Sequence, residues 1–296
     1  MQDTRIETFA RRAGERDRRR ALWIVIPAHN EERRLKPTLD GFLRRLRASD
    51  QVVVVVNGSH DRTSEIASAF AHRDPRVHVI VELDKIGKGG SLVLGFRYVC
   101  ERANVDDAVC FTDADGAVDV TEIVRLISDL EPGDLVIGSR WARGAVQVRT
   151  QPFGRRVASR AFNVCVRTAF SLGIRDTQCP AKALTARDLP RLAERLTSNG
   201  FTFDLDFILA AFEQGLNVRE TPIVWEDQPG STVSIRHAGA IAHDLRLLHD
   251  KYTFRRAAVQ ERAWRVLPSP AMSNLSLVPA VATGPVIPRR REGVSG

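Results

Sequence analysis

Short apolar runs alternate with helix-like segments over the first third of the chain, and this alternation restricts the fold more than any other feature. The apolar runs cover 22–27, 51–56 and 77–81, and the helix-like segments cover 35–46, 63–72 and 91–102. Consecutive strands separated by helices pair in parallel, because the chain must cross back over the sheet before each new strand. The sequence therefore predicts an α/β fold with a mostly parallel sheet and helices on both faces.

The remainder of the chain continues this pattern less regularly. A fourth strand is predicted at 108–112 and stops at Asp113, a helix begins near Thr121 with Asp119 as its capping residue, and a further strand covers 135–138. Beyond these we expect helices at 153–172, 189–196, 204–214 and 238–259 and a strand pair near 218–225. We expect one domain over 21–265, between a basic tail at 1–20 and a Pro- and Ser-rich tail at 266–296, both disordered.

Composition agrees with a globular protein that binds an anion. The chain has 296 residues with 43% hydrophobic content, and none of its apolar runs approaches the roughly 18 residues of a membrane helix. We recognise no secretion signal, and four scattered cysteines favour a reducing cytoplasm over a disulfide framework or a zinc site. The net charge is +8, and residues 135–175 hold eight arginines without lysine or acid. This stretch favours an anionic partner, although a solvated basic face or a nucleic-acid surface are alternatives; aromatics suited to base stacking are scarce in it.

Polar loops follow each of the first four predicted strands, where an open α/β sheet forms its ligand crevice. They cover 27–32, 57–61, 84–90 and 113–116. In the last loop, Asp113 and Asp115 present two hard oxygen ligands that suit Mg²⁺ or Mn²⁺ on a diphosphate. In the third, Lys88 lies among three glycines just before a helix, which favours phosphate binding. A polar turn and an ordinary glycine-rich turn are the alternatives for these two motifs.

The motifs resemble, in order, those of family 2 glycosyltransferases of the GT-A fold, the nucleotide-diphospho-sugar transferase fold with a Rossmann-like sheet. The matching segments are 26–32, 57–63, 87–90, 113–116 and 138–140. Further segments at 173–179, 203–206 and 225–231, with Lys182, resemble the branch of dolichyl-phosphate glucosyltransferases and dolichol-phosphate mannose synthases. The resemblance covers roughly residues 21 to 235, and five motifs in the right order are far more specific than any one of them.

The resemblance implies roles for individual residues. The nucleotide would contact Pro27, His29, Glu31, Asn57, Lys88 and Asp113, and the metal would be held by Asp113 and Asp115. The catalytic residues would be Asp113, Asp115, Arg140, which would meet acceptor phosphate, and Asp206, which would orient a sugar hydroxyl or Arg140. Asp204 and Asp206 could instead form a second metal site or supply a base, and Asp204 could equally serve a helix N-terminus. The alternative for His29 is a turn cap, and for Trp225 it is core packing rather than a platform for the acceptor. The sequence departs from the family at Val56 and Asn57, where relatives carry two acids that contact the nucleotide base. The resemblance therefore does not specify whether the nucleotide carries uracil or guanine.

The acceptor implied by this branch is a polyprenyl phosphate, which is already ionised and needs cations rather than a general base. The arginines available are Arg140, Arg149, Arg155, Arg156 and Arg160. An apolar stripe near them, which includes Phe162, Cys165 and Val166, could lie in a bilayer interface or pack on the sheet.

We therefore predict an inverting, metal-dependent hexosyltransferase in the cytoplasm, peripheral at the cytoplasmic membrane face. It would transfer glucose or mannose from a UDP- or GDP-sugar to polyprenyl or dolichyl phosphate, with Mg²⁺ or Mn²⁺ and without a nucleic-acid partner. The alternatives are a family 2 enzyme with a soluble acceptor and a non-catalytic domain that binds anions or nucleic acid. A nucleotidyltransferase fits less well, because its glycine-rich loop should follow the first strand, where Ala28-His29-Asn30 stands instead.

Overall fold

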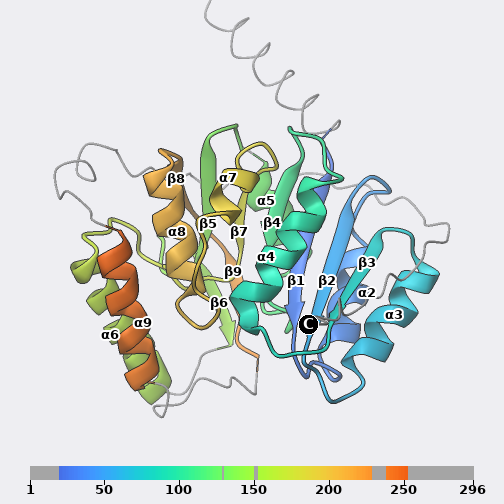
Figure 1. The fold of residues 1–296 in the computed structure, drawn as a ribbon, viewed down its shortest axis with the longest axis horizontal. Coiled ribbons are helices and arrows are strands. Elements are labelled where there is room, and N and C mark those ends of the chain that lie inside the picture. The colour runs from blue at the N-terminus through green and yellow to red at the C-terminus, as the bar shows by residue number, and fades with distance from the viewer. Residues whose placement is uncertain (1–19, 129, 150–152, 229–237, 253–296) are drawn as a thin grey trace, which may run out of the picture.

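A seven-stranded sheet forms the centre of the protein in the computed structural model, which describes residues 20–128, 130–149, 153–228 and 238–252 (Figure 1). The strand order is β3-β2-β1-β4-β7-β5-β8. All pairs are parallel except those of β7, which is antiparallel to β4 and β5. The strands are β1 Leu22–Ala28, β2 Gln51–Asn57, β3 Val77–Glu82, β4 Ala108–Phe111, β5 Asp134–Ser139, β7 Lys182–Thr185 and β8 Asn217–Pro222. The predicted mostly parallel sheet is confirmed, and β7 is a strand that the sequence analysis missed.

Helices cover both faces of this sheet, as predicted. One face packs against α2 (Leu35–Leu43), α3 (Thr63–Arg73) and α5 (Val120–Ile127). The other face packs against α4 (Gly87–Cys100), α7 (Leu189–Ala193) and α8 (Phe203–Glu213). Two further helices, α6 (Phe153–Ala169) and α9 (Ala238–Lys251), lie at the β8 end of the sheet, far from α3 (Figure 1).

The alternation of side chains along the strands creates the two cores. On β1, Ile24 and Ile26 face the α2 side, and Val25 between them faces the α4 side. All three side chains are fully buried, and each contributes on the order of 2 kcal/mol from the transfer of apolar surface out of water. A continuous apolar run is therefore the correct pattern for these strands, because both of their faces are covered.

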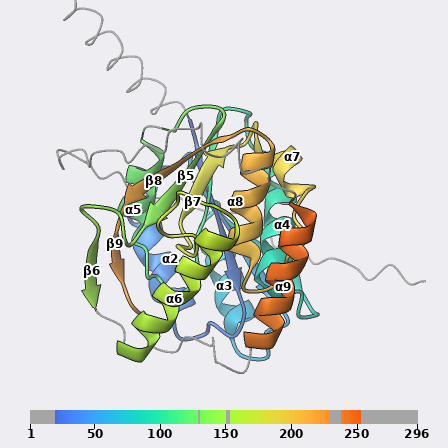
Figure 2. The ribbon, with the colours of Figure 1, turned by 90° about the vertical axis from the view of Figure 1, so that its left-hand side faces the viewer.

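A separate two-stranded ribbon lies beside the main sheet, formed by β6 (Val146–Arg149) and β9 (Val224–Glu226) (Figure 2). The predicted strand pair near 218–225 is therefore divided: β8 pairs with β5, and β9 pairs with β6, which was not predicted. In the ribbon Gln147 pairs with Trp225, which is 6% exposed, and Val146 pairs with Val224 on the opposite face.

The predicted tails fall almost entirely outside the described residues, as does 253–265 at the end of the predicted domain. Arg20, which we assigned to the N-terminal tail, belongs to the fold, because its Nη1 donates to the carbonyl oxygen of Leu130 at 2.8 Å. In the described part of the chain, every helix is too short or too polar to span a bilayer.

Candidate active site

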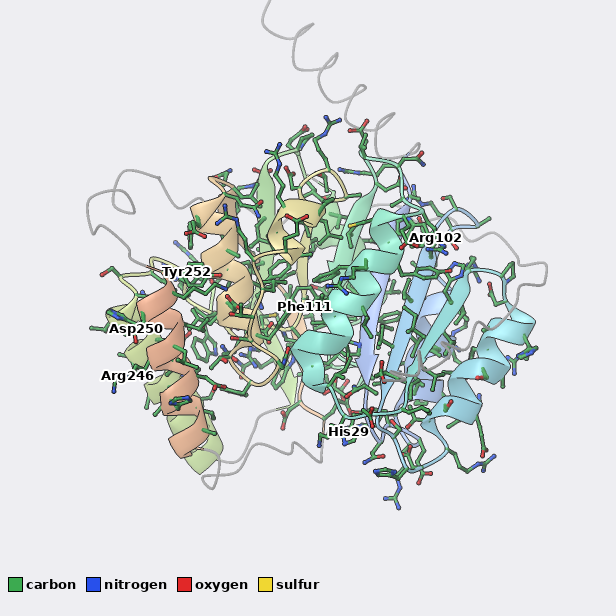
Figure 3. All side chains as sticks on the ribbon, viewed as in Figure 1. His29, Arg102, Phe111, Arg246, Asp250 and Tyr252 are labelled. Carbon is green, nitrogen blue, oxygen red and sulfur yellow. The ribbon has the colours of Figure 1, made fainter. Side chains whose placement is uncertain are left out.

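The loops after β1 and β2 are joined by hydrogen bonds at the carboxyl edge of the sheet, where His29 lies (Figure 3). The Nδ1 of His29 hydrogen-bonds the carbonyl oxygen of Asn57 at 2.8 Å, and the backbone N–H of Glu31 donates to Oγ1 of Thr63 at 2.7 Å. Asn30 has a left-handed φ of 55°, a conformation that asparagine tolerates better than most residues. The first two polar loops therefore form one unit, as their position after neighbouring strands predicts.

Two predicted nucleotide contacts differ in their exposure. Pro27 is the next-to-last residue of β1 and is partly exposed. Asn57 is only 2% exposed: its Nδ2 donates to the carbonyl oxygen of Ala28 at 3.4 Å, and its Oδ1 has no hydrogen-bond partner among the described residues. Val56, where relatives carry an acid, is buried in the core on the α2 side.

Asp113 and Asp115 come together in the turn that follows β4. The Asp113 side chain is 39% exposed, and Oδ1 of Asp115 accepts a hydrogen bond from the backbone N–H of Ala117 at 3.0 Å. Gly116, directly after Asp115, turns the chain with a φ of 73°, a conformation that suits glycine. Burial, and then the charge of Asp113, raise the pKa of Asp115. Two carboxylates that repel each other in this way provide a donor set that a hard divalent cation would stabilise.

Glu31 adds a third carboxylate beside this pair. Its two oxygens accept from Nε and Nη2 of Arg34 at 2.6 and 2.7 Å. Burial raises its pKa, Arg34 lowers it, and the charges of Asp115 and Asp113 raise it further. Within the described residues no group of three or more acidic, His or Cys side chains has the arrangement of a metal site, so the candidate ligands remain the two aspartates.

Lys88 links this acidic pair to α8. Its Nζ lies 2.9 Å from Oδ1 of Asp113 and 3.0 Å from Oδ2 of Asp204. The other oxygen of Asp204 accepts from Nζ of Lys182 at 2.6 Å, and this ammonium also donates to the carbonyl oxygen of Cys179 at 2.6 Å. Burial lowers the pKa of Lys88, but Asp113 and Asp204 outweigh it and raise the pKa, so Lys88 stays charged.

Arg140 directly follows β5 and is held by Asp176. Its Nε and Nη2 lie 2.7 and 2.9 Å from the two carboxylate oxygens, and its backbone N–H donates to Asp176 at 3.0 Å. The guanidinium carbon lies 5.3 Å from the ring centre of Trp225 and 5.7 Å from that of Trp141. Burial lowers the pKa of Arg140, but the charge of Asp176 outweighs it and raises the pKa. The prediction that Asp206 orients Arg140 is therefore wrong, because Asp176 does so.

A further layer fixes Asp176 itself. The backbone N–H groups of Arg175 and Asp176 donate to the two oxygens of Glu220, each at 2.9 Å. Asp176 is fully buried and Glu220 is 6% exposed. The position of Arg140 is thus determined by two acids that the sequence analysis did not single out.

Asp206, which was predicted to be catalytic, lies in α8 and is fully buried. Its oxygens accept hydrogen bonds from four residues other than Arg140, namely Thr197, Ser198, Lys251 and Tyr252. Asp204, two residues earlier, is the acid that pairs with Lys88 and Lys182. Side chains at positions i and i+2 of a helix point about 200° apart. The spacing of Asp204 and Asp206 therefore already indicates that the two acids face different partners.

Other predictions about the acceptor side have mixed outcomes. Trp225 and Val166 are buried, so the packing alternatives hold for these two, and Phe162 packs against the core on the α4 side. Cys165 in the same stripe is exposed. The side chains of Arg149, Arg155 and Arg156 lie outside the described residues.

The geometry agrees with the similarity of the chain to known proteins. Glycosyltransferase AglD of Haloferax volcanii is 32% identical over 219 residues, which are 72% of this chain and 34% of the relative, so the chain spans about a third of that protein. The polyprenol monophosphomannose synthase of Mycolicibacterium smegmatis is 32% identical over 208 residues, which are 69% of this chain and 77% of the relative.

A solved structure shares the fold. The glucosyl-3-phosphoglycerate synthase of Mycobacterium tuberculosis, in complex with Mn²⁺, uridine diphosphate and glucosyl-3-phosphoglycerate, superimposes with a TM-score of 0.57 at 17% identity. The alignment covers 80% of this chain and 81% of that one, which shows the GT-A fold. Residues 23–175, just over half of the chain, match the family model of glycosyl transferase family 2. With the acid pair, the lysine and the arginine arranged along one edge of such a sheet, this chain belongs to glycosyl transferase family 2.

Proposed function

We propose that this protein is an inverting hexosyltransferase that transfers glucose or mannose from a UDP- or GDP-sugar to a polyprenyl phosphate, with UDP or GDP as the leaving group. The observation that carries the proposal is the placement of two partly buried cations, Lys88 and Arg140, near the acid pair Asp113 and Asp115. Asp204 pairs with both Lys88 and Lys182, and Lys182 lies in β7 beside β5, the strand that Arg140 directly follows. Such a site has positions for two phosphorylated molecules, a donor and an acceptor.

On the donor side, the residues supply charge and shape. Asp113 and Asp115 would hold Mg²⁺ or Mn²⁺, which neutralises charge on a departing diphosphate. Lys88 would place its ammonium on the phosphate oxygens of the donor. The free Oδ1 of Asn57 would accept a hydrogen bond from the base, and both uracil and guanine carry a suitable N–H.

On the acceptor side, Arg140 would hold the nucleophile. A phosphate is ionised at neutral pH, so it needs orientation rather than deprotonation. The Arg140 side chain is 12% exposed, and its carboxylate partner fixes the direction of the guanidinium. A fixed, desolvated guanidinium binds an anionic oxygen more strongly than a mobile surface arginine does, because no solvent has to reorganise.

The ribbon gives this acceptor side an apolar outer surface. Val146, Val148 and Val224 are 51%, 62% and 38% exposed. Trp225 of β9 packs beside Arg140, and neighbouring side chains of a strand point to opposite faces. Val224, and Val146 that pairs with it, therefore lie on the face of the ribbon that points away from the proposed acceptor site. An exposed apolar group on a protein of net charge +8 suits an anionic membrane that contains the lipid acceptor. We propose that the protein is peripheral at the cytoplasmic membrane face.

Donor binding is tested by the thermal stability of the protein with UDP- and GDP-sugars, with and without Mn²⁺. We expect one nucleotide to stabilise the wild type by roughly 2.7 kcal/mol at a hundred times its Kd. Asp115→Asn should abolish this gain. Asp119→Asn is the matched control, because asparagine still caps α5 and the side chain lies outside the acid pair. Failure of every donor to stabilise the wild type would refute the proposed function.

Transfer and membrane contact are tested with a short-chain and a long-chain polyprenyl phosphate, the latter in anionic vesicles. We expect a lipid-linked sugar from both acceptors. Val148→Asp should reduce co-flotation with the vesicles and product from the long chain, while product from the short chain is unchanged. The control Val105→Asp changes a valine that is 57% exposed just before β4, at the opposite edge of the sheet. Product formed from soluble phosphorylated acceptors alone would instead establish the soluble-acceptor alternative.

A further inference from the structure

We infer that Asp206 is a positioning residue that couples helix α9 to the glycine-rich start of α4, where Lys88 lies. Asp206 is completely buried, yet it contacts neither the acid pair nor Arg140. Its two oxygens instead serve two different segments of the chain. The inference concerns how the donor side of the site is held in place, and its functional part rests on the function proposed above.

One oxygen of Asp206 holds the end of α9. Oδ1 accepts a hydrogen bond from the hydroxyl of Tyr252 at 2.6 Å and lies 3.0 Å from Nζ of Lys251. Tyr252 is 3% exposed and lies at the end of α9 beside α8, whereas Arg246 and Asp250 of the same helix point outward (Figure 3). A buried carboxylate that receives a hydroxyl and an ammonium fixes their geometry, because the ammonium balances its charge and the hydroxyl supplies a further hydrogen bond.

The other oxygen holds the loop that precedes α8. Oδ2 accepts from the backbone N–H groups of Thr197 and Ser198 at 2.8 and 2.9 Å. Lys251 also donates to Oγ1 of Thr197 at 3.0 Å, so α9 and Asp206 hold the same loop from two sides. The conformation of residues 197–199 therefore depends on α9.

This loop is the surface on which α4 begins. The backbone N–H of Gly89 donates to the carbonyl oxygen of Asn199 at 3.0 Å. A Cβ on Gly89 would lie 2.0 Å from the carbonyl oxygen of Ser198, and one on Gly87 would lie 2.3 Å from that of Asn199. Only glycine allows this approach, so the first turn of α4 rests directly on the backbone of the loop. Lys88 lies between these two glycines and reaches Asp113.

A continuous set of hydrogen bonds thus runs from α9 through Asp206 and the loop to Gly89. If α9 is displaced, the support of the Lys88 turn is weakened, although neither α9 nor Asp206 contacts the acid pair in this structure. An alternative is that Asp206 serves the stability of α9 alone. The two interpretations differ in their prediction for Gly89: only the coupling predicts that its amide exchanges faster when the contacts of α9 with Asp206 are removed.

Two variants remove the α9 side of the connection without touching the proposed site. Tyr252→Phe deletes one hydroxyl and keeps the ring, and Lys251→Met deletes the ammonium and keeps the apolar stem. The control Asp250→Asn changes a residue of the same helix whose nearest ionic contacts are 4.0 Å away. Hydrogen exchange is followed by mass spectrometry in peptides that cover 87–92 and 197–203, and nucleotide affinity by calorimetry with Mn²⁺ and UDP or GDP.

For both variants we expect amide exchange at 87–92 to accelerate roughly fivefold, the factor that corresponds to loss of about one hydrogen bond. Nucleotide Kd should rise by a similar factor, and the control should change neither value. Faster exchange at 197–203 with unchanged exchange at 87–92 would overturn the coupling, as would equal acceleration throughout the chain. The exchange measurement needs no ligand, so it decides the coupling even if no nucleotide binds and the proposed function fails.

Discussion

Replacing Asp204 by asparagine is expected to destabilise the protein by about 3 kcal/mol, because the buried ammonium of Lys182 loses its counter-ion. The Lys182 side chain is fully buried and that of Asp204 is 5% exposed. Besides Asp204, the ammonium contacts the carbonyl oxygen of Cys179, which carries no net charge. Asparagine has nearly the shape of aspartate, so the loss arises from charge rather than from packing. Breaking one partner of a buried pair typically costs about 3 to 5 kcal/mol, and the remaining carbonyl contact favours the lower value.

Urea unfolding followed by circular dichroism measures this loss directly, with an unchanged m-value. A loss of about 3 kcal/mol corresponds to a fall in Tm of roughly 6 to 12 °C for a domain of this size. The double variant Asp204→Leu with Lys182→Met should recover much of the loss, since it removes both charges. Asp40→Asn, which breaks an exposed pair with Lys36, is the control and should cost less than about 1 kcal/mol. A loss at Asp204 as small as this, or a double variant no more stable than the single one, would refute the reasoning.

Three further predictions concern the rest of the fold. Gly95→Ala should lower the free energy of unfolding, measured in urea, by about 1 to 3 kcal/mol, because the new Cβ would lie 2.3 Å from Cγ1 of Val25. Gly41→Ala should raise it by roughly 0.5 to 1 kcal/mol, because a Cβ there would have no atom within 4 Å. Asp119→Ala should lower the unfolding free energy by about 1 kcal/mol through loss of the α5 cap, and an unchanged midpoint would contradict this. Burial raises the pKa of Asp176, but Arg140 outweighs burial and lowers this pKa below its value in the unfolded chain. The contribution of the ionised Asp176 to the free energy of unfolding is therefore complete above about pH 3.9, and it is lost as the pH falls through the pKa of the folded state. Asp176→Asn should therefore flatten the acid side of a plot of unfolding free energy against pH.

The part of the fold that the sequence predicts well is the part with strong apolar runs. In β2, five consecutive valines are buried on both faces, so their pattern has few alternatives. β7 escaped prediction because it has four residues, begins with a lysine and contains one alanine. Its strand conformation comes from pairing with β4 and β5, which tertiary structure supplies and local propensity does not.

The candidate site shows the same division between local and tertiary information. Asp113 lies in the loop predicted after β4, because the end of a parallel strand is a local feature. Lys88 was placed just before a helix, but it lies in the first turn of α4, which begins at Gly87. For Asp206 the sequence offered a sugar hydroxyl or Arg140 as the partner, whereas Arg140 pairs with Asp176, which lies 36 residues later in the chain. Nothing in the spacing of charges specifies which acid meets which base across a fold, so these pairings required the structure.

The reversed direction of β7 has a consequence for where function can be encoded in this sheet. A strand that runs against its neighbours delivers its beginning, rather than its end, to the edge where their loops gather. Lys182 is the first residue of β7 and stands level with Phe111, the last residue of β4. The approach to this strand therefore carries Asp176, Cys179 and Lys182 to the place that its neighbours reach on leaving the sheet. In mixed sheets of this kind, segments that precede an antiparallel strand are as good a place to look for specificity as the loops that follow the parallel ones.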